Sequence, residues 1–174
     1  VLSLSPGETP IEKAEHVSQN ANMWRLVGDV WDIWEDLTHL MKTAEGWYPY
    51  IQPGTWPDCD MIPLGRISIR GERGEERMTR LKREEQISLM TFFTIFKSPL
   101  MFGGDLPSND DFTLSLLTNK EVLKMHRDAV NVRQLYQQEI LFPVLLPGLF
   151  LPGPLQPNHS YCLRAYQVRL LLPQ

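Results

Sequence analysis

Hydrophobic residues follow two patterns along this chain: short continuous runs, and longer stretches in which they recur every three or four positions. Residues 1–5 and 23–28 are short apolar runs that stop at a Pro-Gly pair or at a glycine, which is typical of buried strands. Between them, Thr9 and Pro10 predict the start of a helix, because threonine caps helices and proline suits the first helical position. From residue 30 to residue 44, apolar side chains recur every three or four positions, which predicts a helix with one buried face.

The same alternation continues farther along the chain. Residues 47–51 and 98–103 predict two further strands, and residues 55–61 predict a loop after the first of these. A mostly buried helix is expected over residues 85–97, and two short helices are expected after residue 107. The order β-α-β-α-β-α-β-α predicts parallel βα units, which form either half of a barrel or a small open sheet.

Polar residues refine the limits of these elements. Two capping boxes, Ser108 with Asp111 and Thr118 with Glu121, predict the starts of the two short helices. Residues 71–85 carry charges of both signs, which indicates a solvated loop and helix start. We therefore do not assign this charged segment to a ligand.

The last part of the chain, residues 139–174, differs in composition from the rest. From residue 140 onward it contains no acid, two arginines, ten leucines and six prolines. The prolines interrupt any regular period, and the apolar run is shorter than the roughly 20 residues of a membrane span. We therefore expect no membrane partner. We separate an α/β domain, residues 1–138, from an irregular tail, and hypothesise that the tail is out of frame or foreign to that domain.

Composition and charge weigh against several classes of function. The 174 residues carry 17 basic and 21 acidic side chains, and this net charge of −4 disfavours binding to nucleic acid. No G-x-G-x-x-G motif, P-loop or G-x-S-x-G nucleophile elbow occurs. The four histidines and two cysteines lack the spacing of a metal site, so we expect no metal and no cofactor. The first residues lack the charged segment of a signal peptide, and we expect a processed end or a piece of a longer chain.

Catalytic groups in parallel α/β folds usually lie at the carboxyl ends of the strands. The candidates that follow the predicted strands are Ser5, Asp29, Asp58, Asp60 and Asp105. Asp29 is the best of them, because Arg25 precedes it by four residues and an even spacing keeps two extended side chains on one face. From spacing alone, a simpler role for Asp29 is to cap the following helix. For Asp58 and Asp60 the simpler role is hydrogen bonding within their loop.

Four blocks of residues, in this order, resemble one known family. They are Ser-Leu-Ser-Pro-Gly at 3–7, Asn-Met-Trp-Arg-Leu-Val-Gly-Asp at 22–29, Pro-Gly-Thr-Trp-Pro-Asp-Cys-Asp-Met at 53–61, and Ser-Pro-Leu-Met-Phe-Gly-Gly-Asp-Leu at 98–106. Their order and spacing are similar to the second half of the α-galactosidases of glycoside hydrolase family 27, over residues 1–138. The resemblance implies a partial (β/α)8 barrel, with strands five to eight and their helices in this chain.

The resemblance also implies a mechanism and the residues that perform it. Members of the family are retaining glycosidases, which use one carboxylate as nucleophile and another as acid/base. Asp29 falls on the acid/base position, and Arg25 falls on an arginine that contacts the substrate. Trp56 and Asp60 fall in the loop after the seventh strand as supporting residues, and Ser5 faces the 2-substituent of the sugar. A small residue there is typical of members specific for N-acetylgalactosamine, so we expect an α-galactoside or an α-N-acetylgalactosaminide as substrate.

Two other features of the family have no counterpart in this chain. The implied nucleophile is an aspartate at the end of the fourth strand, which lies before Val1, and the tail stands where a C-terminal β-sandwich is expected. We therefore expect a fragment that is inactive alone and pairs with the missing N-terminal half of the barrel. Two alternatives stay open. One is a truncated, non-enzymatic remnant that binds sugar weakly or pairs with a partner chain, and the other is a small α/β sheet of unrelated function.

Overall fold

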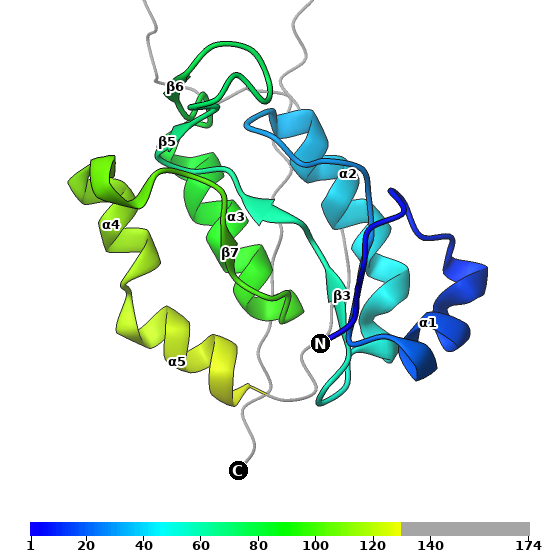
Figure 1. Cartoon of the computed structure of the whole chain (residues 1–174). Coiled ribbons are helices and arrows are strands. Elements are labelled where there is room, and N and C mark those ends of the chain that lie inside the picture. Colours follow the sequence, from blue (N-terminus) through cyan, green and yellow to red (C-terminus); the bar gives the residue numbers. More distant parts are fainter. Residues whose placement is uncertain (130–174) are drawn as a thin grey trace, which may run out of the picture. The chain divides into compact units, whose positions relative to one another are not determined.

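Short strands are interspersed with helices along the chain in the computed structural model, which describes residues 1–129 (Figure 1). Within this described part, the α/β organisation predicted from the sequence is confirmed. The irregular tail, residues 139–174, and the domain boundary expected at residue 138 lie outside the described residues.

The strands are short and mostly parallel. One sheet contains β1 (Ser3–Leu4), β2 (Met23–Arg25) and β3 (Trp56–Asp58), in that order. A second parallel pair contains β4 (Met61–Ile62) and β7 (Met101–Phe102). Because β1, β2 and β3 run in the same direction, their carboxyl ends lie at one edge of the sheet.

Helices follow the parallel strands. They are α1 (Ala14–Asn20), α2 (Trp34–Ala44), α3 (Arg83–Phe96), α4 (Asp111–Leu117) and α5 (Lys120–Asp128). Short 3-10 helices adjoin them: η1 (Ile11–Lys13), η2 (Glu45–Tyr50) and η3 (Leu106–Ser108). None of the helices in residues 1–129 is long and apolar enough to cross a membrane.

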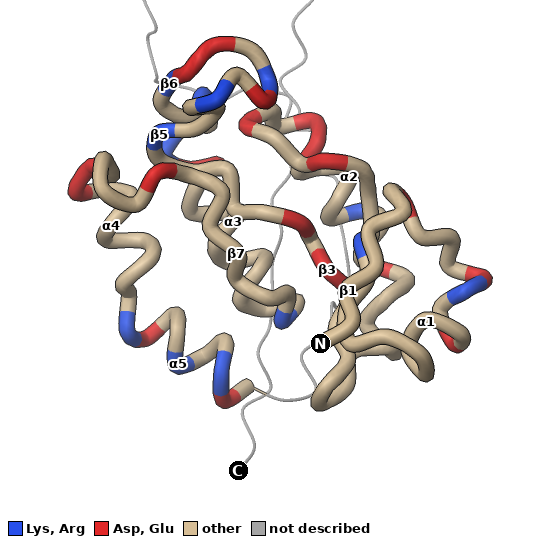
Figure 2. Tube along the Cα trace, viewed as in Figure 1, with Lys and Arg blue, Asp and Glu red and all other residues tan. Residues whose placement is uncertain are grey.

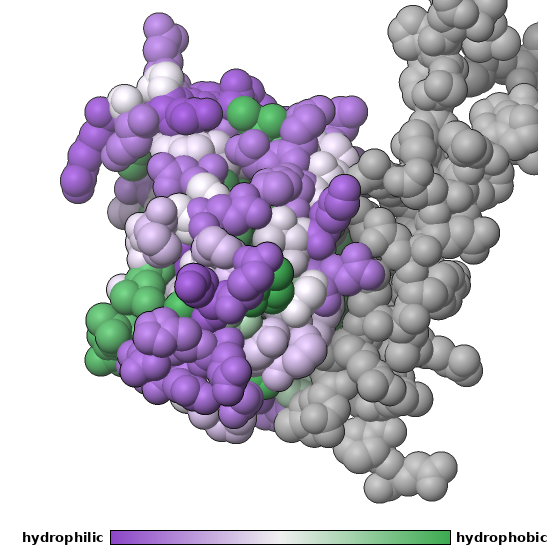
Figure 3. All heavy atoms as spheres, turned by 90° about the vertical axis from the view of Figure 1, so that its right-hand side faces the viewer, coloured by the Kyte–Doolittle hydropathy of each residue, from purple (hydrophilic) through white to green (hydrophobic). Residues whose placement is uncertain are grey.

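An apolar core joins the strands to the helices. Its members include Trp24, Leu26, Leu37, Leu40, Phe93 and Phe96. The helix face predicted from the apolar spacing of residues 30–44 is therefore buried, as expected, from Leu37 onward. The side of the molecule formed by α1 and α2 is largely hydrophilic, which is what an amphipathic helix presents to solvent (Figure 3).

The third strand is not where the sequence pattern places it. The strand predicted over residues 47–51 is wrong, since most of these residues form η2, and residues 56–58 of the predicted loop form β3 instead. The aromatic run favours a strand by local propensity. Trp47 is buried, however, and the centroid of its ring lies 5.8 Å from the ring centroid of Trp24 and 5.8 Å from that of Tyr50. The burial of Trp47 just after the end of α2 therefore outweighs the local preference of these residues for a strand.

The capping role expected of Thr9 is also wrong. The first helical turn is η1, and Pro10 rather than Thr9 is the residue before it. Thr9 is buried, and its backbone N–H donates to the carbonyl of Arg25 at 3.2 Å. The residue thus ties the segment after β1 to the end of β2.

A hairpin that the sequence pattern did not predict follows β4. Its antiparallel strands are β5 (Arg66–Ile67) and β6 (Arg77–Met78). Figure 2 shows charges of both signs along this hairpin. Most of residues 71–85 are exposed, which confirms the solvated character expected of that segment.

Both short helices after residue 107 exist, but neither predicted capping box forms. Asp110 caps α4 by accepting from the N–H of Thr113 at 2.7 Å, and Asn119 caps α5. The predicted caps are engaged elsewhere, because Ser108 donates to the Asp105 carboxylate and Thr118 donates to the carbonyl of Leu114. A hydroxyl that already donates to a nearby acceptor is held away from the following amides.

We expect Asp110→Ala to lower the free energy of unfolding of the 174-residue chain by about 0.5–2 kcal/mol, because α4 loses its cap. Urea unfolding followed by circular dichroism would measure this loss. Ser108→Ala is the matched control and should cost less, since Ser108 bonds only to a side chain in its own turn. An equal loss in the two variants would contradict the assignment of the cap.

Candidate active site

The guanidinium of Arg25, the last residue of β2, gathers polar groups from three segments of the chain. The Arg25 side chain is 10% exposed, and its Nη2 atom donates to the carbonyl of Gly28 at 2.8 Å. The same nitrogen lies 2.9 Å from Oδ2 of Asp60 and 3.2 Å from Oδ1 of Asp29. On the other side, Nη1 donates to the Ser5 hydroxyl at 3.5 Å. We call Ser5, Arg25, Asp29 and Asp60 the Arg25 cluster.

The contact between Arg25 and Asp29 was expected, but it arises from a different backbone than the one expected. The chain bends over residues 26–28 instead of continuing as an extended segment. Leu26 donates its N–H to the carbonyl of Asp58 at 3.0 Å, and the chain turns from there back toward Arg25. The two side chains meet because the chain turns, and not because an even spacing places them on one strand face.

Asp29 presents its carboxylate to the outside of the cluster. Its side chain is 76% exposed in the described structure, and one oxygen faces Arg25. The alternative role as a helix cap is wrong, because α2 begins only at Trp34 and Ile33 occupies the cap position. The neighbouring Val30 donates its N–H to Asp60 at 2.7 Å. The backbone of Asp29 is therefore held on both sides while its side chain stays accessible.

Asp60 joins Arg25 to the segment that follows Asp29. Its carboxylate receives the Arg25 guanidinium and the Val30 N–H on the same oxygen. Its backbone has φ of 70°, in the left-handed region that aspartate tolerates better than most residues. Its own N–H donates to the Asp58 carboxylate at 2.8 Å, so the loop hydrogen bonding expected of these two residues is present.

Asp58 is the last residue of β3, two positions before Asp60, and is almost fully buried. Burial raises the pKa of the Asp58 carboxyl, although the N–H of Asp60 and the charge of Arg25 act in the opposite direction. The sequence offers Asp58 as one of five candidates after the predicted strands, with loop hydrogen bonding as its simpler role, and does not place it beside Arg25. The signal that could have singled it out is its position opposite Arg25 in the parallel sheet, which depends on the register of β2 and β3.

We expect the stability of Asp58→Asn, relative to the unaltered chain, to increase as pH rises from the ordinary pKa of an aspartate through the raised pKa of Asp58. A carboxyl with a raised pKa in the folded state binds more protons there than in the unfolded state, so its contribution to stability falls as pH rises through that interval. Asparagine does not titrate and still accepts from Asp60. Urea midpoints at several pH values would measure the difference. Glu12→Gln, at an exposed position on η1, is the control, and a pH dependence as large in this variant as in Asp58→Asn would contradict the prediction.

Within residues 1–129, Trp56 and Asp105 form no hydrogen bond or ion pair with the Arg25 cluster. Trp56 opens β3 opposite Met23, at the amino end of the sheet, so its expected position in the loop after the strand is wrong. The physical reason is that three residues of the predicted loop pair with β2. Asp105 accepts from Ser108 at the start of η3.

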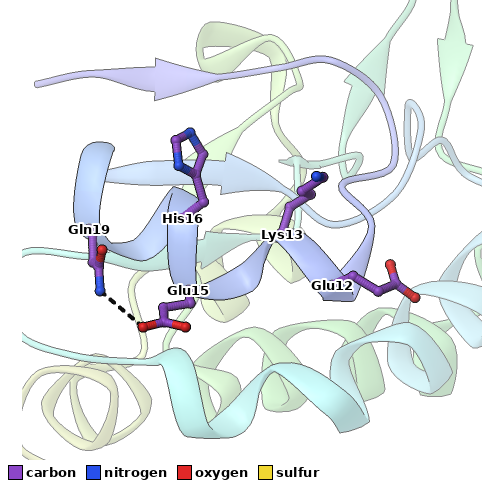
Figure 4. Close-up of a pocket in the computed structure, with 5 residues that line it drawn as sticks. All are labelled: Glu12, Lys13, Glu15, His16 and Gln19. Carbon is purple, nitrogen blue, oxygen red and sulfur yellow. Dashed lines mark hydrogen bonds between the residues drawn. The ribbon is translucent and has the colours of Figure 1, made fainter.

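Other possible sites in the described residues have weaker geometry. A shallow hollow on η1 and α1 is lined by Glu12, Lys13, Glu15, His16 and Gln19 (Figure 4). All five side chains are exposed and come from one short stretch of helix, so they do not converge on a bound molecule. Within residues 1–129, no group of three or more His, Cys, Asp or Glu side chains is placed to hold a metal ion.

The chain is similar in sequence to known glycosidases. The family model described as Alpha galactosidase A matches residues 7–128. Alpha-galactosidase 2 of Arabidopsis thaliana is 35% identical over 112 residues, which cover 64% of this chain and 25% of that protein. Alpha-galactosidase of Cyamopsis tetragonoloba is 33% identical over 112 residues, or 64% of this chain and 24% of that protein. The chain thus spans about a quarter of the length of these relatives.

A solved structure is more similar in sequence to this chain than these two relatives are. The GH27 β-L-arabinopyranosidase of Geobacillus stearothermophilus superposes with a TM-score of 0.76 at 49% sequence identity. The match covers 79% of this chain and 32% of that enzyme. The fold is therefore similar to the barrel of glycoside hydrolase family 27.

Proposed function

Because the chain belongs to the alpha-galactosidase A family within glycoside hydrolase family 27, we propose that it supplies the acid/base side of a retaining α-glycosidase site. The observation that carries the proposal is the gathering of Ser5, Asp29 and Asp60 around the guanidinium of Arg25. Hydrolysis of a glycoside requires a carboxyl group that protonates the leaving oxygen, beside groups that bind the sugar hydroxyls. In our proposal Asp29 takes the first role, and Arg25 and Ser5 take the second.

The geometry of the Arg25 cluster supports the choice of Asp29 over Asp60 for proton transfer. Asp60 is the nearer carboxylate, at 2.9 Å from Arg25 against 3.2 Å for Asp29, and its side chain is 15% exposed against 76% for Asp29. Asp60 also accepts the N–H of Val30, so its carboxylate is already engaged in the fold. Asp29 is thus the carboxylate that a substrate can reach, as proton transfer to a leaving oxygen requires.

We further propose that the parallel strands are the fifth to eighth of a (β/α)8 barrel. Within residues 1–129, β1 pairs only with β2, and β7 pairs only with β4, so each has an open edge. An N-terminal half of a barrel would pair with both edges. A strand next to β1 would then bring the nucleophilic carboxylate to about 5–5.5 Å from Asp29, the separation of retaining enzymes. On this proposal the chain is inactive alone.

The substrate we propose is a terminal α-galactoside, as the names of the curated relatives suggest. A β-L-arabinopyranoside is the second candidate, because the solved enzyme that is 49% identical acts on that sugar. The two sugars have the same configuration at the ring carbons they share, and galactose alone carries a hydroxymethyl group. The same positions of Asp29 and Arg25 would therefore serve both. The small Ser5 also leaves room for the N-acetyl group of an α-N-acetylgalactosaminide.

A graft tests this proposal in a complete barrel. Residues 1–129 of this chain would replace the matching segment of the G. stearothermophilus β-L-arabinopyranosidase, which supplies the rest of the fold. We expect the graft to hydrolyse an aryl β-L-arabinopyranoside, an aryl α-galactoside, or both. The ratio of the two rates decides between the candidate sugars.

Folding of the graft is measured separately from its activity. Circular dichroism and size-exclusion chromatography report the fold, and tryptophan fluorescence reports binding of galactose or arabinose. A folded graft that binds sugar but turns over neither glycoside would contradict the proposal and favour a non-enzymatic remnant. The 174-residue chain alone serves as the second arm, and turnover by it would contradict the expectation that the nucleophile lies elsewhere.

A further inference from the structure

Asp32 lies three residues after Asp29, in the segment that joins β2 to α2, and its side chain is fully buried. Its carboxylate accepts five hydrogen bonds from two arginines that are 45 and 48 residues away in sequence. Arg77 donates from Nη2 at 2.6 Å and from Nε at 3.0 Å. Arg80 donates from Nη2 at 2.9 Å, from Nε at 2.9 Å and from its backbone N–H at 3.0 Å.

This cluster connects the hairpin to the segment that carries Asp29. Arg77 belongs to β6, and its Nη1 atom also donates to the carbonyls of Arg73 and Glu75 within the hairpin turn. One guanidinium thus joins the turn of the hairpin to Asp32. A second ion pair, between Arg66 and Glu76, closes the hairpin without contacting Asp32.

The segment after β2 is held at successive points along its length. Arg25 binds the carbonyl of Gly28, and Asp60 binds the N–H of Val30, on the two sides of Asp29. Asp32 adds an anchor next to α2, beyond the point held by Asp60. Because a carboxylate that accepts from two guanidiniums has a narrow range of favourable positions, this anchor fixes the direction in which the segment leaves the active site.

The charge of Asp32 is essential to this anchor. Burial alone would raise the pKa of Asp32, but the hydrogen bonds from Arg77 and Arg80 hold the pKa well below its usual range. Asparagine has the same size, yet it offers one acceptor oxygen and places an amide donor against guanidinium donors. Asp32→Asn therefore opposes the contact instead of merely weakening it.

We infer that Asp32, held by Arg77 and Arg80, is a positioning residue that sets the place of Asp29 in the active site. The inference rests on the proposed function, since it assigns Asp32 a role in the same proton transfer. Asp32 acts through the backbone of residues 29–32, without touching the substrate. A shift of about 1 Å in a catalytic group lowers turnover by about 100-fold, so a loosened segment would lower the rate while sugar binding persists.

In the graft, we expect Asp32→Asn to lower kcat about 10- to 100-fold with little change in KM. The loss should be larger for a natural disaccharide than for an aryl glycoside with a good leaving group, because only the former needs full protonation of its leaving oxygen. Glu76→Gln is the matched control, since it breaks the other ion pair of the same hairpin and should leave kcat unchanged. Equal losses in both variants, or a loss confined to KM, would overturn the inference.

Amide hydrogen exchange on the 174-residue chain tests the anchor without any activity. We expect Asp32→Asn to speed exchange of residues 28–32 by about tenfold or more, and Glu76→Gln to affect only the hairpin. Arg80→Gln is the milder variant if Asp32→Asn does not fold, because Arg80 is half exposed and Arg77 remains to pair with Asp32. Unchanged exchange at residues 28–32 would overturn the inference. An inactive graft with the expected exchange would instead contradict the proposed function alone.

Discussion

Asp29→Asn in the graft is expected to lower kcat/KM for a natural α-galactoside or arabinoside by about 10²–10⁴-fold, the usual contribution of a general acid/base. Asparagine can still accept a hydrogen bond from Arg25, so the cluster keeps its shape while the proton is lost. The expected loss on an aryl substrate with a good leaving group is smaller in the first step, because that leaving group departs without protonation. Comparing the two substrates therefore separates acid catalysis from damage to the fold.

The second chemical step gives an independent check on Asp29. Hydrolysis of the glycosyl-enzyme intermediate requires the same residue as a base that activates water. Azide needs no such base, so added azide should raise turnover of an aryl substrate by Asp29→Ala and give a glycosyl azide with retained configuration. Asp111→Asn, at an exposed position in the first turn of α4, is the matched control and should behave like the unaltered graft. Full activity of Asp29→Asn on the natural substrate would remove Asp29 from the acid/base role.

Trp47→Ala should produce the largest loss of stability, about 3–5 kcal/mol in the free energy of unfolding, as for other large-to-small changes in a core. Trp47 is 1% exposed and packs against Trp24 and Tyr50, so the deletion leaves a cavity lined by large rings. Urea unfolding of the 174-residue chain, with the slope of the transition checked for two-state behaviour, measures the change.

Two further variants make this measurement decisive. Ile87→Ala removes a large apolar side chain that is 49% exposed on α3, and it should change stability by no more than about 0.5 kcal/mol. Trp47→Phe keeps most of the ring packing and should lose less than Trp47→Ala. If Trp47→Ala cost no more than Ile87→Ala, Trp47 would not be part of the core, and the assignment of residues 45–50 to a 3-10 helix that buries Trp47 would fail.

The sequence predicts the chemistry of the candidate site better than its geometry. Ser5, Asp29 and Asp60 follow from the rule that functional groups lie at the carboxyl ends of parallel strands, Arg25 follows from its spacing to Asp29, and the family resemblance implies a role for each of the four. The structure brings all four together. Trp56 lies in β3 instead of the loop expected after the strand, because its place depends on which residues pair with β2, and pairing in a parallel sheet is decided by contacts remote in sequence.

The sequence by itself determined the α/β organisation of the chain, because the period of apolar residues is a local property and survives in any packing that buries one face. It also determined the main helices, α2 and α3, whose faces are marked by that period. Only the tertiary structure decided the third strand, the helix caps, the hairpin and the anchoring of Asp32. Each of these depends on which of several available partners a polar or aromatic group contacts. Arg77, for example, binds Asp32 from 45 residues away in the sequence. The energy of such a choice comes from burial and hydrogen bonding in three dimensions, which no local pattern of residues encodes.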